Sequence, residues 1–279
     1  MLKWILFILV LNGSAGAAPA PEIPADLDKA SEEGEGGDAV ATEALEDAIL
    51  AVRAYDAGRF DESIALLQKA ALAGPGRGHV LYNLGNAYYR AGRRGAAVAA
   101  WLGAAQLLPR DPDIKANLVM AMKKNKDKLQ AELPLPFWSR PFFWAGAFNH
   151  RELLWSAAVL IFLACLVWSV TLLVRRPGLP GAVAGGALLL AGLFIGGGWL
   201  ARDAVSPPFG AVTVAETGVF SGPGAGNAEV FRLHEGAPVN FIRTNGDWNL
   251  IGISDGKRGW ISTRHMLVFT RGVHPDFAG

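Results

Sequence analysis

Cysteine is almost absent from this sequence, which has one, Cys165, inside an apolar run. A single cysteine cannot form a disulfide within the chain, and it cannot build a zinc site based on several cysteines. The absence of disulfides does not decide between a reducing and an oxidising compartment. Targeting signals must therefore decide where the chain resides.

An excess of charge of either sign is missing as well. The chain has 26 lysine and arginine residues against 25 aspartate and glutamate residues, for a formal net charge of +1. A role in binding nucleic acid therefore has no global electrostatic support.

Recognisable catalytic motifs are also lacking. There is no Walker sequence, and Ser221 does not lie in a G-x-S-x-G motif. No pair of histidines has the spacing of a metal motif such as H-E-x-x-H. We therefore expect no catalytic residue, no metal site and no cofactor, and predict that the chain is not an enzyme. The histidines are His79, His150, His234, His265 and His274.

The N-terminus has the three parts of a secretory signal peptide, predicted over residues 1–17. Lys3 supplies the positive start, Trp4 to Leu11 form a short apolar core, and Ala15-Gly16-Ala17 fits the small-residue cleavage rule. The alternative is an uncleaved anchor, although the apolar core is too short to span a bilayer. Residues 18–42, rich in Pro, Gly and acid, predict a disordered acidic linker.

Two stretches of the chain repeat each other at a spacing of 34 residues. The matching pairs are Gly58 and Gly92, Ala70 and Ala104, and Pro75 and Pro109. The second copy reads Leu81-x2-Leu84-Gly85-x2-Tyr88, then Ala97-x3-Trp101. This closely resembles the tetratricopeptide repeat (TPR), a helix–turn–helix unit of about 34 residues. The resemblance implies an α-helical TPR solenoid with a capping helix over residues 43–131, whose concave face holds another protein.

The TPR resemblance also implies which side chains line the groove. Asparagine amides can hydrogen-bond a bound backbone, and tyrosines give apolar area with a polar tip. The alternative is that these residues merely cover a solvated face. The implied protein-binding residues are Tyr55, Tyr82, Asn83, Asn86, Tyr89, Arg90 and Asn117, with Ile49, Val52, Asp56, Met120 and Lys124 beside them.

Two uncharged runs, residues 153–174 and 181–201, are each long enough to cross roughly 30 Å of hydrocarbon. They predict a transmembrane hairpin with a cytoplasmic turn at 175–180, because Arg175-Arg176 belongs in the cytoplasm by the positive-inside rule. The flanking domains then face the periplasm, as the signal peptide also predicts. The aromatic residues of segment 132–152 suit the headgroup layer, and partner docking is the alternative.

The second span contains glycines spaced by four, in the pairs Gly181/Gly185 and Gly192/Gly196. Small residues at this spacing let membrane helices pack closely. They predict either packing against the chain's own first span or contact with an external partner, and both can hold on different faces.

In residues 208–271 the sequence pattern changes and becomes typical of short β-strands joined by turns. Asn245-Gly246 is a strong two-residue hairpin signal, and Asp255-Gly256 marks the next turn. The pattern resembles a bacterial SH3-like (SH3b) domain, a small all-β barrel. Its matching residues are Val219-Phe220-Ser221-Gly222-Pro223-Gly224, Leu233-x2-Gly236-x2-Val239, Gly246-Asp247-Trp248 and Gly256-x2-Gly259-Trp260. Trp248 and Trp260 are candidates for a ligand site on the barrel, or alternatively for its core.

The order of these segments resembles the BatE-type tetratricopeptide proteins of the Bacteroides aerotolerance clusters. That resemblance implies association with membrane proteins bearing von Willebrand A domains and with a MoxR-type ATPase, in envelope stress or oxygen tolerance. The leading hypothesis is an inner-membrane scaffold with both soluble domains in the periplasm. The alternative is a cell-wall sensor whose SH3b-like domain binds peptidoglycan peptides.

Overall fold

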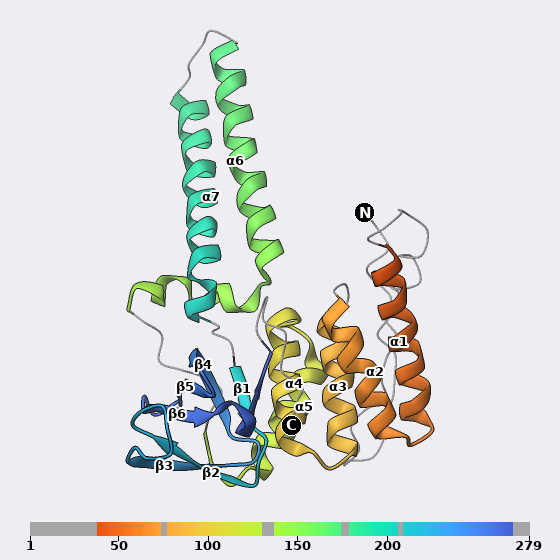
Figure 1. Cartoon of the computed structure of the whole chain (residues 1–279). Helices are drawn as coiled ribbons and strands as arrows, with labels where there is room; N and C mark the ends of the chain where they lie inside the picture. The colour runs from red at the N-terminus through yellow and green to blue at the C-terminus, as the bar shows by residue number, and fades with distance from the viewer. Residues whose placement is uncertain (1–37, 74–76, 130–136, 174–178, 206–208, 270–279) are drawn as a thin grey trace.

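The computed structural model describes residues 38–73, 77–129, 137–173, 179–205 and 209–269. It has three parts, namely the helices α1–α5, the long apolar helices α6 and α7, and a seven-stranded antiparallel sheet. Figure 1 shows α1–α5 side by side, α6 and α7 projecting together from one end, and the sheet beside α4. The predicted signal peptide and the predicted turn between the spans lie outside the described residues, apart from the first two residues of α7.

The five N-terminal helices follow one another with short connections. They are α1 (Asp38–Asp56), α2 (Phe60–Ala73), α3 (Arg77–Arg90), α4 (Arg94–Leu107) and α5 (Pro112–Lys124). Because α1 begins at Asp38, residues 38–42 are helical and do not belong to the linker to which the sequence analysis assigns them. The start of α5 is set by Asp111, whose carboxylate accepts hydrogen bonds from the backbone N–H groups of Asp113 (2.9 Å) and Ile114 (3.1 Å).

The 34-residue repeat recurs in the backbone as two matching helix ends. Gly58 and Gly92 both adopt the left-handed conformation, with φ of +75° and +79°. In each copy the glycine N–H donates to the residue three before it, and the following arginine N–H donates to the residue five before it. This pair of backbone hydrogen bonds is the Schellman motif, which favours glycine at the position with positive φ. Both glycines of the repeat therefore end a helix in the same way.

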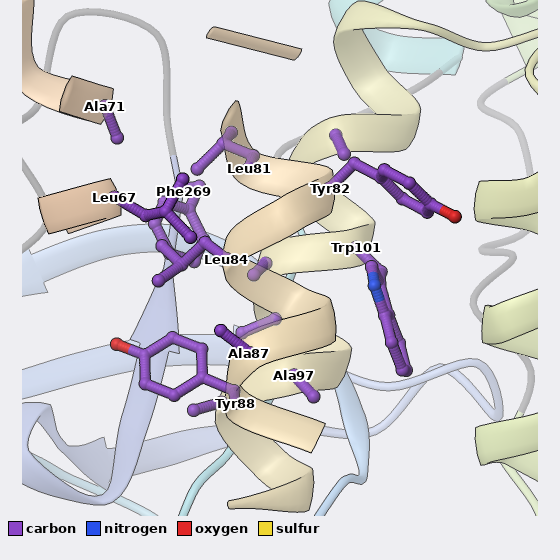
Figure 2. Close-up of a cluster of buried hydrophobic side chains, with 14 of the residues drawn as sticks. Leu67, Ala71, Leu81, Tyr82, Leu84, Ala87, Tyr88, Ala97, Trp101 and Phe269 are labelled. Carbon is purple, nitrogen blue, oxygen red and sulfur yellow. The ribbon is translucent and has the colours of Figure 1, made fainter. Parts of the chain in front are cut away.

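The core of the helical part is built around α3 and α4. A Cβ on Gly85 would lie 2.4 Å from the indole of Trp101, so only glycine permits this approach of the two helices. Trp101 and Ala97 are completely buried. Figure 2 shows Tyr82 and Trp101 on one side of α3, and Leu67, Leu84 and Phe269 on the other.

The apolar hairpin consists of α6 (His150–Leu173) and α7 (Leu179–Val205), preceded by the 3₁₀ segment η2 (Phe137–Ala147). Asn149 and Glu152 form a reciprocal cap at the start of α6, because each side chain accepts a hydrogen bond from the other's backbone N–H (2.9 and 2.8 Å). Both helices are long and apolar enough to cross a membrane. Only 11% and 17% of their most apolar windows are buried, unlike the core helix of a soluble protein.

The sheet has the strand order β3-β2-β6-β5-β4-β1-β7. Gly246 (φ +57°) and Gly256 (φ +86°) occupy the two predicted turns. Alternate residues such as Val219, Ile251 and Ile261 point into a buried cluster. The strands are β1 (Phe209–Val212), β2 (Glu216–Phe220), β3 (Glu229–His234), β4 (Pro238–Asn245), β5 (Trp248–Gly252), β6 (Arg258–Ser262) and β7 (Met266–Val268). Strands β3 and β7 lie at the two ends of this order. Among the described strands, no pairing between these two closes the sheet into a barrel.

Candidate functional site

Asn86, implied as a partner-binding residue, lies in the interior. It is completely buried, and its Oδ1 accepts hydrogen bonds from the indole N–H of Trp101 (3.1 Å) and from the amide of Asn117 (3.0 Å). These three residues belong to α3, α4 and α5. The oxygen therefore ties three helices together, and it is not presented on an open face.

Burial extends to other implied groove residues. Tyr55 and Tyr82 retain 6% exposure, and Asn83 and Asn117 retain 5%. The expectation of an open groove lined by these side chains therefore differs from the structure. Burial also raises the pKa of the Tyr55 hydroxyl, an effect that the nearby Arg90 guanidinium opposes.

Two implied residues do remain accessible. Arg90 is exposed and Tyr89 is half-buried. The Arg90 guanidinium carbon lies 5.0 Å from the ring centre of Phe60 and 5.7 Å from that of Tyr55. Lys124 donates a hydrogen bond from Nζ to the Tyr89 hydroxyl (3.1 Å). We call Arg90, Lys124, Tyr55, Phe60 and Tyr89 the cation–aromatic end of the helical part.

Three of the four predicted packing glycines of α7 face α6. A Cβ on Gly181 would lie 2.3 Å from Thr171, on Gly185 2.3 Å from Trp168, and on Gly192 2.8 Å from Ile161. Gly196 has no neighbour within 4 Å of that position. Packing against the chain's own first long helix is thus the role of three glycines, while for Gly196 contact with an external partner stays a prediction.

The aromatic segment before α6 packs on α7. Phe142 and Trp144 of η2 stack against Phe194, with ring centres 5.3 and 5.6 Å apart. Gly197 and Gly198 make room for these rings, since a Cβ on either would come within 3 Å of one of them. The four-residue spacing of the predicted pairs does not include these two glycines. The side chains of residues 137–139 lie outside the described part.

The two candidate tryptophans share one face of the sheet. Trp260 is 7% exposed and pairs across strands with Phe220 and Leu250. The Arg243 guanidinium carbon lies 5.4 Å from the ring centre of Trp260. Trp248, half-buried, meets Phe220 edge to face at 5.6 Å. The result is a row of aromatic rings covered at one end by an arginine, with Trp260 largely enclosed within it.

The sheet docks on the helical part through contacts that no local pattern predicted. The Gly95 N–H, at the start of α4, donates to the carboxylate of Glu235 (3.0 Å). Beyond α5, Asp127 accepts a hydrogen bond from the His234 N–H (2.6 Å) and contacts the ring Nδ1 of the same residue (3.0 Å). The Asn125 amide donates to the Gly236 carbonyl (2.5 Å). Helices and sheet therefore form one packed body.

A second junction fastens the apolar hairpin to that body. Arg202 of α7 is 1% exposed, and it donates hydrogen bonds to the backbone carbonyls of Phe148 (2.5 Å) and Gln106 (2.8 Å). Arg110 forms an ion pair with Glu152 and lies over the Phe148 ring. Glu152 thus pairs with Arg110, and Arg202 binds two backbone carbonyls.

Within the part of the chain that the structure describes, no group of three or more His, Cys, Asp or Glu side chains is arranged to hold a metal ion. Comparison with models of known protein families, with curated proteins and with solved structures finds no match. The tetratricopeptide and SH3b resemblances accordingly rest on the motifs themselves.

Proposed function

We propose that this chain is an inner-membrane scaffold that holds envelope proteins on a rigid periplasmic body. The observation that carries the proposal is the double junction at Arg202 and Arg110, which fixes the helical part to α6 and α7. A catalyst requires a cluster of acid, base or metal groups, whereas a scaffold requires an anchored, rigid surface.

The proposed orientation is supported by the connectivity of the chain. The helical part precedes α6 and the sheet follows α7, so both lie at the same end of the hairpin (Figure 1). Arg175 and Arg176 fall in the sequence between α6 and α7. By the positive-inside rule, we assign this connection to the cytoplasm and both folded parts to the periplasm. The predicted signal peptide supports the same orientation.

The partner class is taken from the BatE-type resemblance, namely membrane proteins with von Willebrand A domains. The accessible residues of the implied groove, Tyr89 and Arg90, are where we expect contact. A photo-crosslinking amino acid at Tyr89 in intact membranes tests this, with the same probe at exposed Val119 of α5 as the control. Adducts to one or two membrane proteins at position 89 alone support the scaffold. Adducts only to lipid, or the same adducts at both positions, argue against it.

A second candidate is a cell-wall sensor, favoured by the aromatic row at Trp248, Phe220 and Trp260. Arg243 on that row offers a positive charge to the carboxylate of a wall peptide. The test uses the full chain, because Ala211, Leu267 and Phe269 of the C-terminal part are buried in the helical core and an isolated segment would expose them. Co-sedimentation with purified sacculi, reduced by Arg243→Ala, supports this reading; absence from the pellet removes it.

A further inference from the structure

Two exposed cations at the ends of α3 and α5 rest on aromatic rings. Arg90 lies over Phe60 and Tyr55, and the Lys124 Nζ lies 5.8 Å from the ring centre of Tyr89. Contacts of this kind are weakly attractive at exposed sites. They hold each charge in place without neutralising it.

Neighbouring arginines at the same end of the helical part are paired differently. Arg59 binds Glu62 at 2.6 Å, and Arg93 binds Asp61 at 2.8 Å. Across the described ranges, neither Arg90 nor Lys124 forms an ion pair with a carboxylate. The cation–aromatic end therefore offers two fixed positive charges to an acidic ligand.

We infer that this ligand is the chain's own acidic segment, residues 22–37. The segment contains six acidic residues and one basic residue, Lys29, so its charge is complementary to that of the site. It is tethered directly to α1, and a short tether gives an effective concentration in the millimolar range. Weak, exposed ion pairs are sufficient at such a concentration. The inference goes beyond the proposed scaffold role, and because both use Tyr89 and Arg90, the bound segment would compete with a partner for this end.

Chain geometry selects which carboxylates reach the site. The site lies at Tyr55, 17 residues along α1 from Asp38, a distance of about 26 Å at 1.5 Å per residue. Asp28 precedes Asp38 by ten residues, and an extended chain of that length covers about 34 Å. Glu33 precedes it by five, which covers only about 17 Å. Glu22, Asp26 and Asp28 can therefore bind at the cation–aromatic end, whereas Glu33 and Glu35 cannot.

Carbodiimide cross-linking of the full chain in detergent micelles tests this assignment. The reagent joins a carboxylate to a lysine amine as an amide and takes up the released water as a urea. We expect amides within one chain between Lys124 and Glu22, Asp26 or Asp28, identified by mass spectrometry. Arg90→Glu, which leaves Lys124 in place, should lower their yield roughly three- to tenfold. Arg90→Lys should largely restore it.

Matched variants separate the inference from general charge effects. Replacing two reaching acids (Glu22→Gln with Asp26→Asn) should lower the yield more than replacing two non-reaching acids (Glu33→Gln with Glu35→Gln). Lys115, exposed on the same helix as Lys124, should not cross-link to this segment. Thermal unfolding of each variant checks that it is folded.

Three results would overturn the inference: equal cross-linking at Lys115 and Lys124, adducts formed only between chains, or an unchanged yield in Arg90→Glu. Adducts only between chains would assign the site to a second copy.

Discussion

Gly95 of α4 and Val212 of β1 approach so closely that a Cβ on Gly95 would lie 2.1 Å from the Val212 carbonyl oxygen. The neighbour is backbone, so it cannot rotate away as a flexible side chain would. The absence of a side chain at Gly95 therefore allows β1 to pack directly against α4.

Gly95→Ala should loosen this docking. Alanine favours an isolated helix over glycine by about 1 kcal/mol, so a loss of stability must come from the displaced sheet. We expect a net destabilisation of about 1–3 kcal/mol, as for overpacked cores. Thermal unfolding in micelles, with hydrogen exchange of β1, measures it. Gly186→Ala in α7 is the control, because nothing lies within 4 Å of its Cβ position. Equal stability of the two variants would contradict the prediction.

Asn86→Ala should destabilise the helical part by about 2–3 kcal/mol, because the buried donors of Trp101 and Asn117 lose their shared acceptor. Chemical unfolding followed by tryptophan fluorescence measures the change. Arg90→Ala, on the same helix but exposed, loses only its contacts with Phe60 and Tyr55 and should cost about 1 kcal/mol or less. A neutral Asn86→Ala variant would show that the hydrogen-bonded triad does not hold α3, α4 and α5 together.

Arg202→Met should uncouple the apolar hairpin from the helical part. The variant loses two charge-assisted hydrogen bonds to carbonyls, each contributing roughly 1.5–3 kcal/mol. We expect faster hydrogen exchange at the end of α4 and the start of α6, with both helices still formed. Arg243→Met on the sheet serves as the matched arginine control. Unchanged exchange in Arg202→Met would mean that Arg110 and Glu152 suffice.

Alkaline pH should weaken the helical part through its buried tyrosines. Burial raises the pKa of Tyr55 and of Tyr88, the latter despite a hydrogen bond accepted from Gln68. Because the pKa is raised in the folded state, the neutral side chains stabilise the fold relative to the ionised ones. This contribution to stability is complete below the ordinary tyrosine pKa of about 10 and is lost as pH rises above it. Absorbance titration near 295 nm should show Tyr55 and Tyr88 ionising late. Tyr88→Phe should remove one of them; if it removes none, Tyr88 ionises normally.

Local signals predicted the elements well. Gly58, Gly92, Gly246 and Gly256 stop or turn the chain where the sequence indicates, because their conformations depend on few neighbours. The two uncharged runs became α6 and α7, since charge-free length is itself the signal.

The site was less predictable, because it depends on contacts between distant residues. Repeat position alone implied that Asn86 is open, but its partners on α4 and α5 enclose it. Arg202 reads from its neighbours as an ordinary flanking charge, and only the return of α7 to Phe148 and Gln106 reveals its role. The sheet docks through Asp127 and His234, which are 107 residues apart.

Phe269 lies deep among helices whose sequence ended well over a hundred residues earlier, against Gly103 and Leu67 (Figure 2). A ribosome adding about 5–20 residues per second needs on the order of ten seconds or more to travel from α4 to this side chain. During that interval the first helices are already outside the ribosome, yet the apolar surface that Phe269 covers is still exposed. A chain that stops before Phe269 would therefore leave apolar helix surface exposed to chaperones and proteases.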